Sequence, residues 1–304
     1  MTVRDHFNSF HPLLKLIFDL VIVLIVGFFF FVVLLFFTAH LNGYGMLEFF
    51  SIAAQSAATD IVLYKKLQVI YSLSVFLAPP FLIAFIYSRS AFDYLRINKS
   101  PKLGSFFLVI LLVISLIPIV NILGSVNSSM HLPSAFSGLE SVIKEMEQNA
   151  KIITDRILNV DSIGGLISNI IIIALLPALG EEFFFRGILQ RHFTEWFKNE
   201  HWAIIVTAFL FSSMHLQFLS FLPRFFLGII LGYLFVMSKS LWLNITAHFV
   251  NNAIAVIAYY IMIQKGLSPD SFDSVGIGAT SLITSIVFFV LIFYSLMRLE
   301  KYRF

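Results

Sequence analysis

The sequence predicts an all-α fold, a polytopic bundle of about eight membrane-spanning helices. Of the 304 residues, 59% are hydrophobic and only 12% are charged, against about 25% charged in typical soluble domains. Apolar runs of about 20 residues, the length that crosses a bilayer, recur along the whole chain. A soluble fold could not bury this much apolar surface, so both observations indicate an integral membrane protein.

Eight stretches qualify as spans. Their approximate ranges are 16–39, 67–88, 103–123, 164–187, 203–221, 223–239, 241–263 and 277–297. Only a turn at Pro223 separates the fifth from the sixth, and the sixth is short, so a count of seven stays open. The first run is longer than the ~7–15 residues of a signal-peptide core. It is therefore expected to be a span, not a cleaved signal.

The distribution of basic residues predicts the orientation, because cytoplasmic loops carry an excess of Lys and Arg. With both ends inside, thirteen of the twenty Lys and Arg residues lie on the cytoplasmic side and seven on the other. We therefore expect a multi-pass protein with both termini cytoplasmic, in the cytoplasmic membrane if the source is bacterial. The basic residues are scattered among short loops and form no patch, so nucleic-acid binding is not expected.

The chain is expected to have three regions. Residues 1–163 hold the first three spans and an outer amphipathic loop, residues 164–262 hold spans four to seven, and residues 263–304 hold the last span and a cytoplasmic tail. The long connection, about 124–163, includes apolar residues at near-helical spacing from Leu139 to Val160. This helix either lies on the membrane surface or caps the bundle, or is solvated and has no functional role.

Three segments carry ionisable residues at membrane depth, where a charged group costs at least ~2.5 kcal/mol on insertion scales and suggests function by default. The first is ALGEEFFFRG, residues 178–187. On a helix, residues four apart share a face, so Arg186 can neutralise Glu182, while Glu181 points about 100° away. A snorkelling cluster at a helix end explains the pair but leaves Glu181 without a role, and a general base is the alternative.

The other two segments carry histidines. His215 is expected near the middle of an otherwise apolar helix, in FLFSSMHLQF, and His248 and Asn252 lie at i and i+4 in NITAHFVNNAI. Polar contact between helices is the commoner explanation for each segment taken singly. Counting ~1.5 Å per residue from the expected cytoplasmic helix ends, Glu181 lies roughly 9 Å deep, His248 roughly 10 Å and His215 roughly 18 Å. All three can therefore line one cavity that opens to the cytoplasm.

Together these patterns resemble the motifs of the CAAX prenyl protease and bacteriocin-processing (CPBP) family of intramembrane endopeptidases, also called the type II CAAX protease or abortive-infection family. The motifs E-E-x-x-x-R, F-x-x-x-H and H-x-x-x-N are matched in order by Glu181, Glu182 and Arg186, by Phe211 and His215, and by His248 and Asn252. Each motif is weak alone, but all three occur in the family's order on apolar spans. The resemblance covers about residues 164–262.

The resemblance implies a role for each motif residue. Glu181 and His215 would activate a water for attack on a peptide carbonyl, and His248 and Asn252 would stabilise the oxyanion. The remaining glutamate and arginine would be a structural pair that orients the site. These roles agree with the chemistry of the residues, because a carboxylate and an imidazole can exchange protons and two donors can face one cavity.

The family has also been described as metalloproteases. In that case Glu181, His215 and His248 would bind zinc and leave one position open for water. The chain has no cysteine and no H-E-x-x-H helix, so thiolate sites and the familiar zinc-protease arrangement are excluded. The preferred interpretation has no metal and no other cofactor, and zinc is the alternative.

The leading hypothesis is an intramembrane endopeptidase that cuts a peptide or protein segment reaching it from the membrane or its cytoplasmic face. Eukaryotic members of the family act on prenylated C-terminal tails and others process or protect against peptides, so prenylation is not assumed. Two other classes stay open. One is a non-catalytic membrane protein that confers peptide immunity or binds a partner. The other is an ion or proton carrier, which the lack of a repeated half disfavours.

Overall fold

The computed structural model describes residues 3–55 and 60–301, and within them every regular element is a helix. Seven helical segments are long and apolar enough to cross a bilayer. They are α2 (Pro12–Leu41), α4 to α5 (Ile61–Tyr87), α7 (Leu103–Ser128), α9 to α11 (Ile163–Phe197), η5 to α13 (Phe218–Ser238), α14 (Leu241–Gln264) and α15 (Ala279–Leu299). An eighth, α12 (Glu200–Ser213), has 14 residues. These elements agree with an all-α bundle of about eight spans.

Shorter elements divide or connect these segments. Three π-helical stretches interrupt the long helices, and single turns or short helices join them. Their bounds are α1 (Val3–Asn8), α3 (Met46–Gln55), α4 (Ile61–Tyr71), η1 (Ser72–Leu77), α5 (Ala78–Tyr87), α6 (Ala91–Tyr94), η2 (Ser134–Phe136), α8 (Ser137–Leu158), α9 (Ile163–Asn169), η3 (Ile170–Leu175), α10 (Leu176–Phe184), η4 (Phe185–Leu189), α11 (Gln190–Phe197), η5 (Phe218–Ser220), α13 (Phe221–Ser238) and η6 (Pro269–Ser274).

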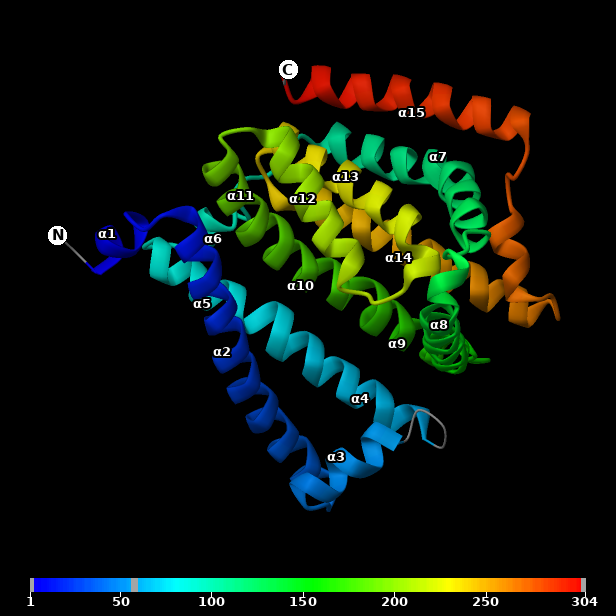
Figure 1. Ribbon diagram of the computed structural model, residues 1–304, viewed down its shortest axis with the longest axis horizontal. Coiled ribbons are helices and arrows are strands. Elements are labelled where there is room, and N and C mark those ends of the chain that lie inside the picture. Colours follow the sequence, from blue (N-terminus) through cyan, green and yellow to red (C-terminus); the bar gives the residue numbers. More distant parts are fainter. Residues whose placement is uncertain (1–2, 56–59, 302–304) are drawn as a thin grey trace.

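The elements α10, α12, α13 and α14 occupy the middle of the molecule, and α7 and α15 pack together on one side of them (Figure 1). On the other side, α2 crosses α5 and then diverges towards α3 and α4. One apolar core lies between α2, α5, η4 and α14, and a second lies between α7, α13, α14 and α15. The central helices are therefore enclosed by apolar side chains from both sides.

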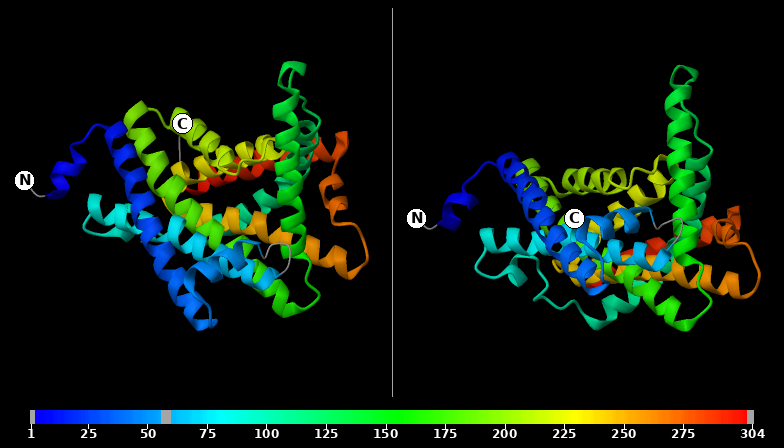
Figure 2. Two further views of the ribbon diagram at one scale, coloured as in Figure 1. Left: turned by 60° about the horizontal axis from the view of Figure 1, so that its bottom comes forward. Right: turned by 90° about the horizontal axis from the view of Figure 1, so that it is seen from below.

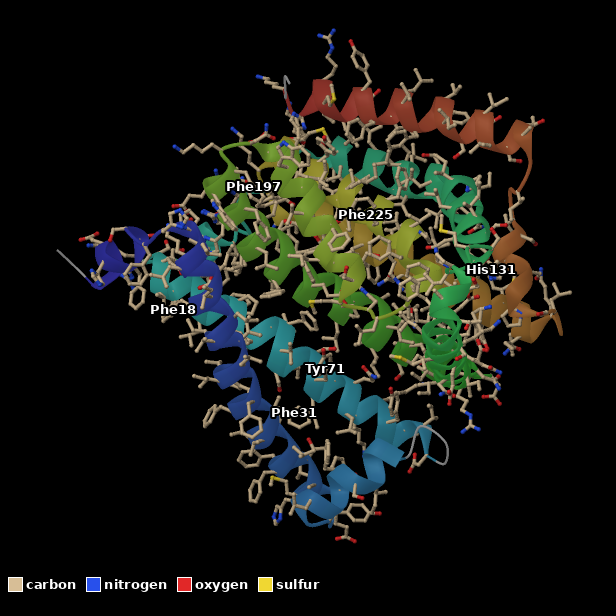
Figure 3. All side chains as sticks on the ribbon, viewed as in Figure 1. Phe18, Phe31, Tyr71, His131, Phe197 and Phe225 are labelled. Carbon is tan, nitrogen blue, oxygen red and sulfur yellow. The ribbon has the colours of Figure 1, made fainter. Side chains whose placement is uncertain are left out.

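The outer surface is also apolar. Along α2, Leu24, Phe28 and Phe29 are 64%, 70% and 60% exposed, and Figure 3 shows carbon-rich side chains such as Phe31 projecting from this helix. In water these exposed apolar side chains would raise the free energy of the folded protein, because burial of apolar surface is favourable. In a bilayer the same side chains contact lipid, so the exposed surface agrees with an integral membrane protein.

Proline residues account for the breaks in two of the long helices. Pro79 and Pro80 lack backbone donors and follow the π-helical stretch η1 directly, and Pro177 follows η3. A proline inside a helix removes one hydrogen bond and crowds the carbonyl four residues before it. The wider π turns avoid this crowding, and such turns are frequent at functional sites. The helix containing Pro79 is thus able to continue past the proline through a π-helical stretch.

The structure corrects the boundaries of the fourth and fifth spans. The fourth helix does not end near residue 187 but continues to Phe197, so Glu181 lies sixteen residues from its end, roughly 24 Å. The fifth helix ends at Ser213, and His215 lies in the turn that follows, not in the middle of a helix. Leu216 adopts a φ of +52°, which interrupts the helix.

Tertiary contacts explain why the chain can leave the helix at His215. The Asn127 side chain on α7 donates to the Phe218 carbonyl at 3.0 Å and accepts from the Leu222 amide at 2.6 Å. The Glu147 carboxylate on α8 accepts from the Leu219 amide. These side chains replace hydrogen bonds that a continuous helix would have made, and none of the replacements is visible in the local sequence.

The amphipathic helix expected from Leu139 to Val160 is present as α8, Ser137–Leu158. It stands away from the bundle over much of its length (Figure 2), with most side chains exposed and with Ile157 and Leu158 buried in its last turn. Whether it contacts lipid stays a prediction, as does the division of the chain into three regions.

A buried polar cluster joins α2 to α11. Asp19 is 0% exposed and accepts hydrogen bonds from the Tyr87 hydroxyl at 3.0 Å and from His192 Nε2 at 2.7 Å. Nearby, Lys15 Nζ lies 2.6 Å from Glu195 Oε1. Because buried polar groups are costly unless paired, these contacts specify how α2 docks on the central helices. The sequence motifs do not include any of these residues.

Candidate active site

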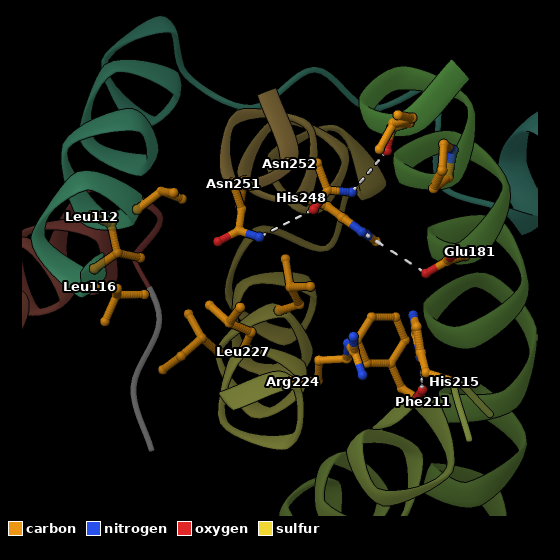
Figure 4. A pocket seen from close by; sticks show the side chains of 16 residues that line it. Leu112, Leu116, Glu181, Phe211, His215, Arg224, Leu227, His248, Asn251 and Asn252 are labelled. Atoms are coloured by element: carbon orange, nitrogen blue, oxygen red, sulfur yellow. Dashed lines mark hydrogen bonds and ion pairs between the residues drawn. The ribbon is translucent and has the colours of Figure 1, made fainter. Parts of the chain in front are cut away.

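One cavity of about 260 Å³ brings together the four residues that the sequence indicates as catalytic. Glu181 comes from α10, His215 from the turn after α12, and His248 and Asn252 from α14 (Figure 4). Most of the remaining wall is apolar and is contributed by Leu112, Val113, Leu116, Ile173, Pro177, Leu227, Ile230, Leu231 and Ala247. Residues far apart in the sequence therefore share one mostly apolar cavity.

One carboxylate oxygen of Glu181 accepts no hydrogen bond from the described residues. Its side chain is 16% exposed, and its buried Oε2 has no hydrogen-bond partner among the described residues. The preceding Gly180 permits this placement: a Cβ there would lie 2.6 Å from the Phe76 Cβ and 3.3 Å from the Phe76 backbone on η1. Only glycine allows the two helices to approach so closely, so the close packing of Gly180 fixes the position of the carboxylate.

The hydrogen bond of His215 defines its tautomer. Its Nδ1 lies 2.9 Å from the Phe211 carbonyl oxygen. A carbonyl can only accept, so Nδ1 carries the proton and Nε2 of the neutral ring has a free lone pair. Phe211 thus belongs to the site through its backbone, which gives the F-x-x-x-H spacing a physical meaning: the carbonyl four residues earlier orients the imidazole.

His248 is held between two carboxylates. Its Nδ1 donates to Glu182 Oε1 at 2.8 Å, and its Nε2 lies 3.9 Å from Glu181 Oε2. The Nδ1 hydrogen bond fixes the ring plane and directs Nε2 towards the cavity, in the way that a second carboxylate orients a functional histidine. When the ring is protonated, Nε2 becomes a donor towards the cavity.

Glu182 and Arg186 form a fully buried ion pair behind this histidine. Arg186 Nη1 donates to Glu182 Oε1 at 2.7 Å, and both side chains are 0% exposed. Arg186 Nη2 also donates to the Gly228 carbonyl at 3.2 Å, and the guanidinium lies 4.7 Å from the Phe211 ring centroid. One glutamate therefore connects α10 to α14 through His248, and one arginine connects η4 to α12 and α13.

The amide side chains at the cavity have weaker contacts. Asn252 Nδ2 lies 3.4 Å from the Ile173 carbonyl, and Asn251 Nδ2 donates to Asn252 Oδ1 at 3.2 Å. The long contact to Ile173 leaves the Asn252 amide free to exchange this partner for a better acceptor in the cavity. Asn251 also lines the cavity, and the sequence motifs do not include it.

Arg224 is a further cavity residue that sequence reasoning missed. In the expected topology it is only one of the seven basic residues on the outer side. Its isolation in the long apolar run FLSFLPRFFLGIILG is the signal that could have found it, because a lone cation among spans suggests function.

The donor set does not fit a metal ion as the side chains are placed. Among the described residues, no three His, Asp or Glu side chains converge closely enough to hold one. A zinc ion needs its ligands within about 2.0–2.2 Å, and the carboxylate and two imidazoles that share the cavity lack that convergence. We therefore derive no chemical step through a metal.

Comparison with known proteins finds one family match. Residues 163–254 match the family described as type II CAAX prenyl endopeptidase Rce1-like. A segment of 92 residues, 29% of this chain, is 30% identical to the uncharacterized protein YpbD of Bacillus subtilis (strain 168) and spans 44% of that protein. The alignment thus covers less than half of the curated relative. No solved structure matches.

The matched range contains all three motifs, whose seven residues run from Glu181 to Asn252. The family resemblance inferred from the motifs is therefore confirmed for this part of the chain: residues 163–254 of this multi-pass membrane protein match the type II CAAX prenyl endopeptidase Rce1-like family.

Proposed function

We propose that the protein is a glutamate-dependent intramembrane endopeptidase. The observation that carries the proposal is the convergence of a Glu181 carboxylate whose Oε2 accepts no hydrogen bond among the described residues, the free Nε2 of His215 and two potential donors in one mostly apolar cavity. Cleavage of an amide by water requires groups that accept a proton from the water and groups that donate hydrogen bonds to the carbonyl oxygen.

In the proposed reaction, a water lies between Glu181 and His215 and loses a proton to one of them as its oxygen attacks the peptide carbonyl carbon. The negative charge that develops on the carbonyl oxygen is stabilised by His248 Nε2–H and the Asn252 amide. The tetrahedral intermediate then collapses, the C–N bond breaks, and the stored proton is transferred to the leaving amine. Water supplies the hydroxyl of the new acid and the proton of the new amine.

In this proposal Glu182 and Arg186 are positioning residues. Their ion pair lies behind His248 and does not line the cavity. It keeps Nε2 of the histidine aimed at the cavity and does not touch the reacting atoms.

A cleavage assay tests the proposal. The purified protein is reconstituted in liposomes and given a library of quenched fluorescent peptides, with and without prenyl groups. Glu181→Gln and His215→Ala should each lower kcat/KM by about 100-fold or more, in the range of general acid–base catalysis. Glu145→Gln on the exposed face of α8 and His40→Ala at the end of α2 are matched controls that should cleave normally. Unchanged cleavage by a correctly folded Glu181→Gln protein would refute the proposal and favour a non-catalytic binding or immunity role.

We further propose that cleavage needs no metal or other cofactor. The support is the donor geometry, in which no described set of His and acidic side chains converges on one point. Metal analysis of active protein, together with chelator treatment, tests this. Stoichiometric zinc, and activity lost to the chelator and restored by zinc, would overturn it and assign Glu181, His215 and His248 as ligands.

We also propose that both termini are cytoplasmic and that the substrate is a peptide or protein segment reaching the cavity from the membrane or its cytoplasmic face. The support is the excess of Lys and Arg in the loops assigned to that side. Because the chain has no cysteine, single cysteines at Ser9 and Ser141 would report orientation directly. A membrane-impermeant maleimide should label Ser141→Cys but not Ser9→Cys in intact cells. The opposite pattern would reverse the topology.

A further inference from the structure

Arg224 is a cation in the wall of the active-site cavity whose presence the fold does not explain. It lies in the first turn of α13 and is partly buried. A cation is disfavoured at a helix N-terminus, where the helix dipole is positive. It is also disfavoured within a membrane-spanning segment. Helix stability therefore gives no reason for an arginine at this position.

The partners of Arg224 leave part of its guanidinium unused. Nη2 donates to the Gln217 side-chain oxygen, whereas Nη1 is buried and has no hydrogen-bond partner among the described residues. The acidic groups whose charges reach it are Glu147 and Glu181. No described carboxylate lies within ion-pair distance of it, and Glu147 accepts a hydrogen bond from the Leu219 amide instead. The guanidinium thus retains a buried donor without a hydrogen bond and has no ion-pair partner among the described residues.

Arg224 also stands where two cavities meet. A second cavity of about 260 Å³ extends from it towards Asn121 and Phe272, along walls formed by α7, α13 and α14. Five residues line both cavities: Val113, Leu116, Arg224, Leu227 and Asn251. Each cavity alone is smaller than the ~300–1,000 Å³ of typical ligand sites. The two cavities taken together reach that range, and the guanidinium lies where they meet.

Snorkelling to the membrane surface is the simpler explanation for an arginine near a helix end. It does not suit this side chain, because its Nη1 is buried and it lines both cavities. In Figure 4 Arg224 lies among the side chains that line the cavity. Its guanidinium therefore belongs to the cavity walls.

We propose that Arg224 is a specificity-determining residue that binds a carboxylate of the peptide substrate. The inference rests on the proposed peptidase function and adds the substrate chemistry. A guanidinium is always charged and matches a carboxylate with two parallel hydrogen bonds. The carboxylate is either the C-terminal one or an acidic side chain, and in both cases Arg224 fixes its separation from the scissile bond. The second cavity then accepts apolar side chains next to that carboxylate.

The test compares peptides that differ in one charge. The wild-type protein is given a cleavable peptide as the free acid and as the C-terminal amide, and a second pair with Glu or Gln at one position after the scissile bond. We expect the anionic member of one pair to have a kcat/KM about ten- to a hundred-fold higher, the factor expected for a hydrogen bond to a charged group. The free-acid pair and the Glu/Gln pair distinguish the two sources of the carboxylate.

Variants assign the preference to the guanidinium. In Arg224→Gln the ratio of kcat/KM between the anionic and the neutral peptide should fall to about one, mainly because the KM of the anionic peptide rises. Arg224→Lys should keep part of it, since the charge remains but the planar fork is lost. Gln217→Glu should also reduce the preference for the anionic peptide. The new carboxylate would bind Arg224 in competition with the substrate, and the arginine itself would stay in place. Arg298→Gln, on the exposed face of α15, is the matched control and should keep the wild-type ratio.

Two results would overturn the inference. One is equal cleavage of anionic and neutral peptides by the wild type. The other is a preference that persists in Arg224→Gln. If the wild type cleaves no peptide, the peptidase proposal fails, but the inference is still tested by binding of the labelled free-acid and amide peptides to Glu181→Gln protein. Tighter binding of the free-acid peptide than of the amide, lost in the double variant Glu181→Gln, Arg224→Gln, supports the inference. Equal binding of the two peptides to Glu181→Gln protein refutes it.

Discussion

Replacing Arg186 by methionine tests whether the buried ion pair behind the active site supports the fold. Arg186 Nη1 lies 2.7 Å from Glu182 Oε1, and both side chains are 0% exposed. Removing one partner of a buried pair leaves the other charge without compensation and costs about 3–5 kcal/mol. The hydrogen bond to the Gly228 carbonyl at 3.2 Å is lost as well. We expect Arg186→Met to be the least stable single variant of the site.

The expected loss can be read from thermal unfolding in detergent. For large domains, 1 kcal/mol corresponds to about 2–4 °C in Tm, so the apparent Tm of Arg186→Met should fall by roughly 10 °C. In the double variant Glu182→Gln, Arg186→Met, the buried charge is gone, and the glutamine oxygen can still accept from His248. Most of the lost stability should therefore return. Peptide cleavage should stay impaired, because a neutral amide orients the imidazole less strongly than a carboxylate does.

The variant Arg298→Met is the control, since this arginine is exposed on α15 and its loss should leave Tm unchanged. A Tm of Arg186→Met within about 1 °C of the wild type would refute the reasoning about buried charge. A double variant as unstable as the single one would show that packing of the arginine, not the unpaired carboxylate, is responsible.

Three further predictions concern single side chains. Gly180→Ala places a Cβ 2.6 Å from that of Phe76, and the displaced Glu181 should lower kcat by about 100-fold in the cleavage assay. Asp19→Ala leaves two buried hydrogen-bond donors unpaired and should cost about 1–3 kcal/mol for each, seen as a lower Tm. The hydrogen bond from His131 and the ion pair with a lysine lower the pKa of Glu140 from 4.5 to about 2. The resulting stabilisation of α8 is complete above pH 4.5 and is lost as the pH falls through 2, which amide hydrogen exchange of α8 would show.

Three results would contradict these expectations. Gly138→Ala, where an added Cβ meets nothing within 4 Å, should keep full activity, and an equal loss in both glycine variants would contradict the first. An Asp19→Ala protein as stable as the wild type would contradict the second. For the third, Glu140→Gln should abolish the change in α8 protection between pH 4.5 and 2, and persistence of that change would assign it to another group.

Periodicity, composition and short motifs in the sequence were enough to predict the fold class and to select the candidate site. The apolar runs predict the spans because a bilayer requires about 20 apolar residues per crossing. The motif spacing places Glu182 one turn before Arg186, and His248 one turn before Asn252, because residues four apart share a helical face. These are local relations, so they can be read from the sequence without a structure.

The tertiary structure decided what depends on distant residues. The helix ends at Ser213 because Asn127 and Glu147 stabilise the turn that follows, and both belong to other helices. Glu182 holds His248 as well as Arg186, a contact across sixty-six positions that no helical periodicity encodes. Arg224 reaches the cavity only because α13 packs against α7 and α14. Hydrogen bonds between helices arise from packing in three dimensions, and for that reason they were absent from the sequence prediction.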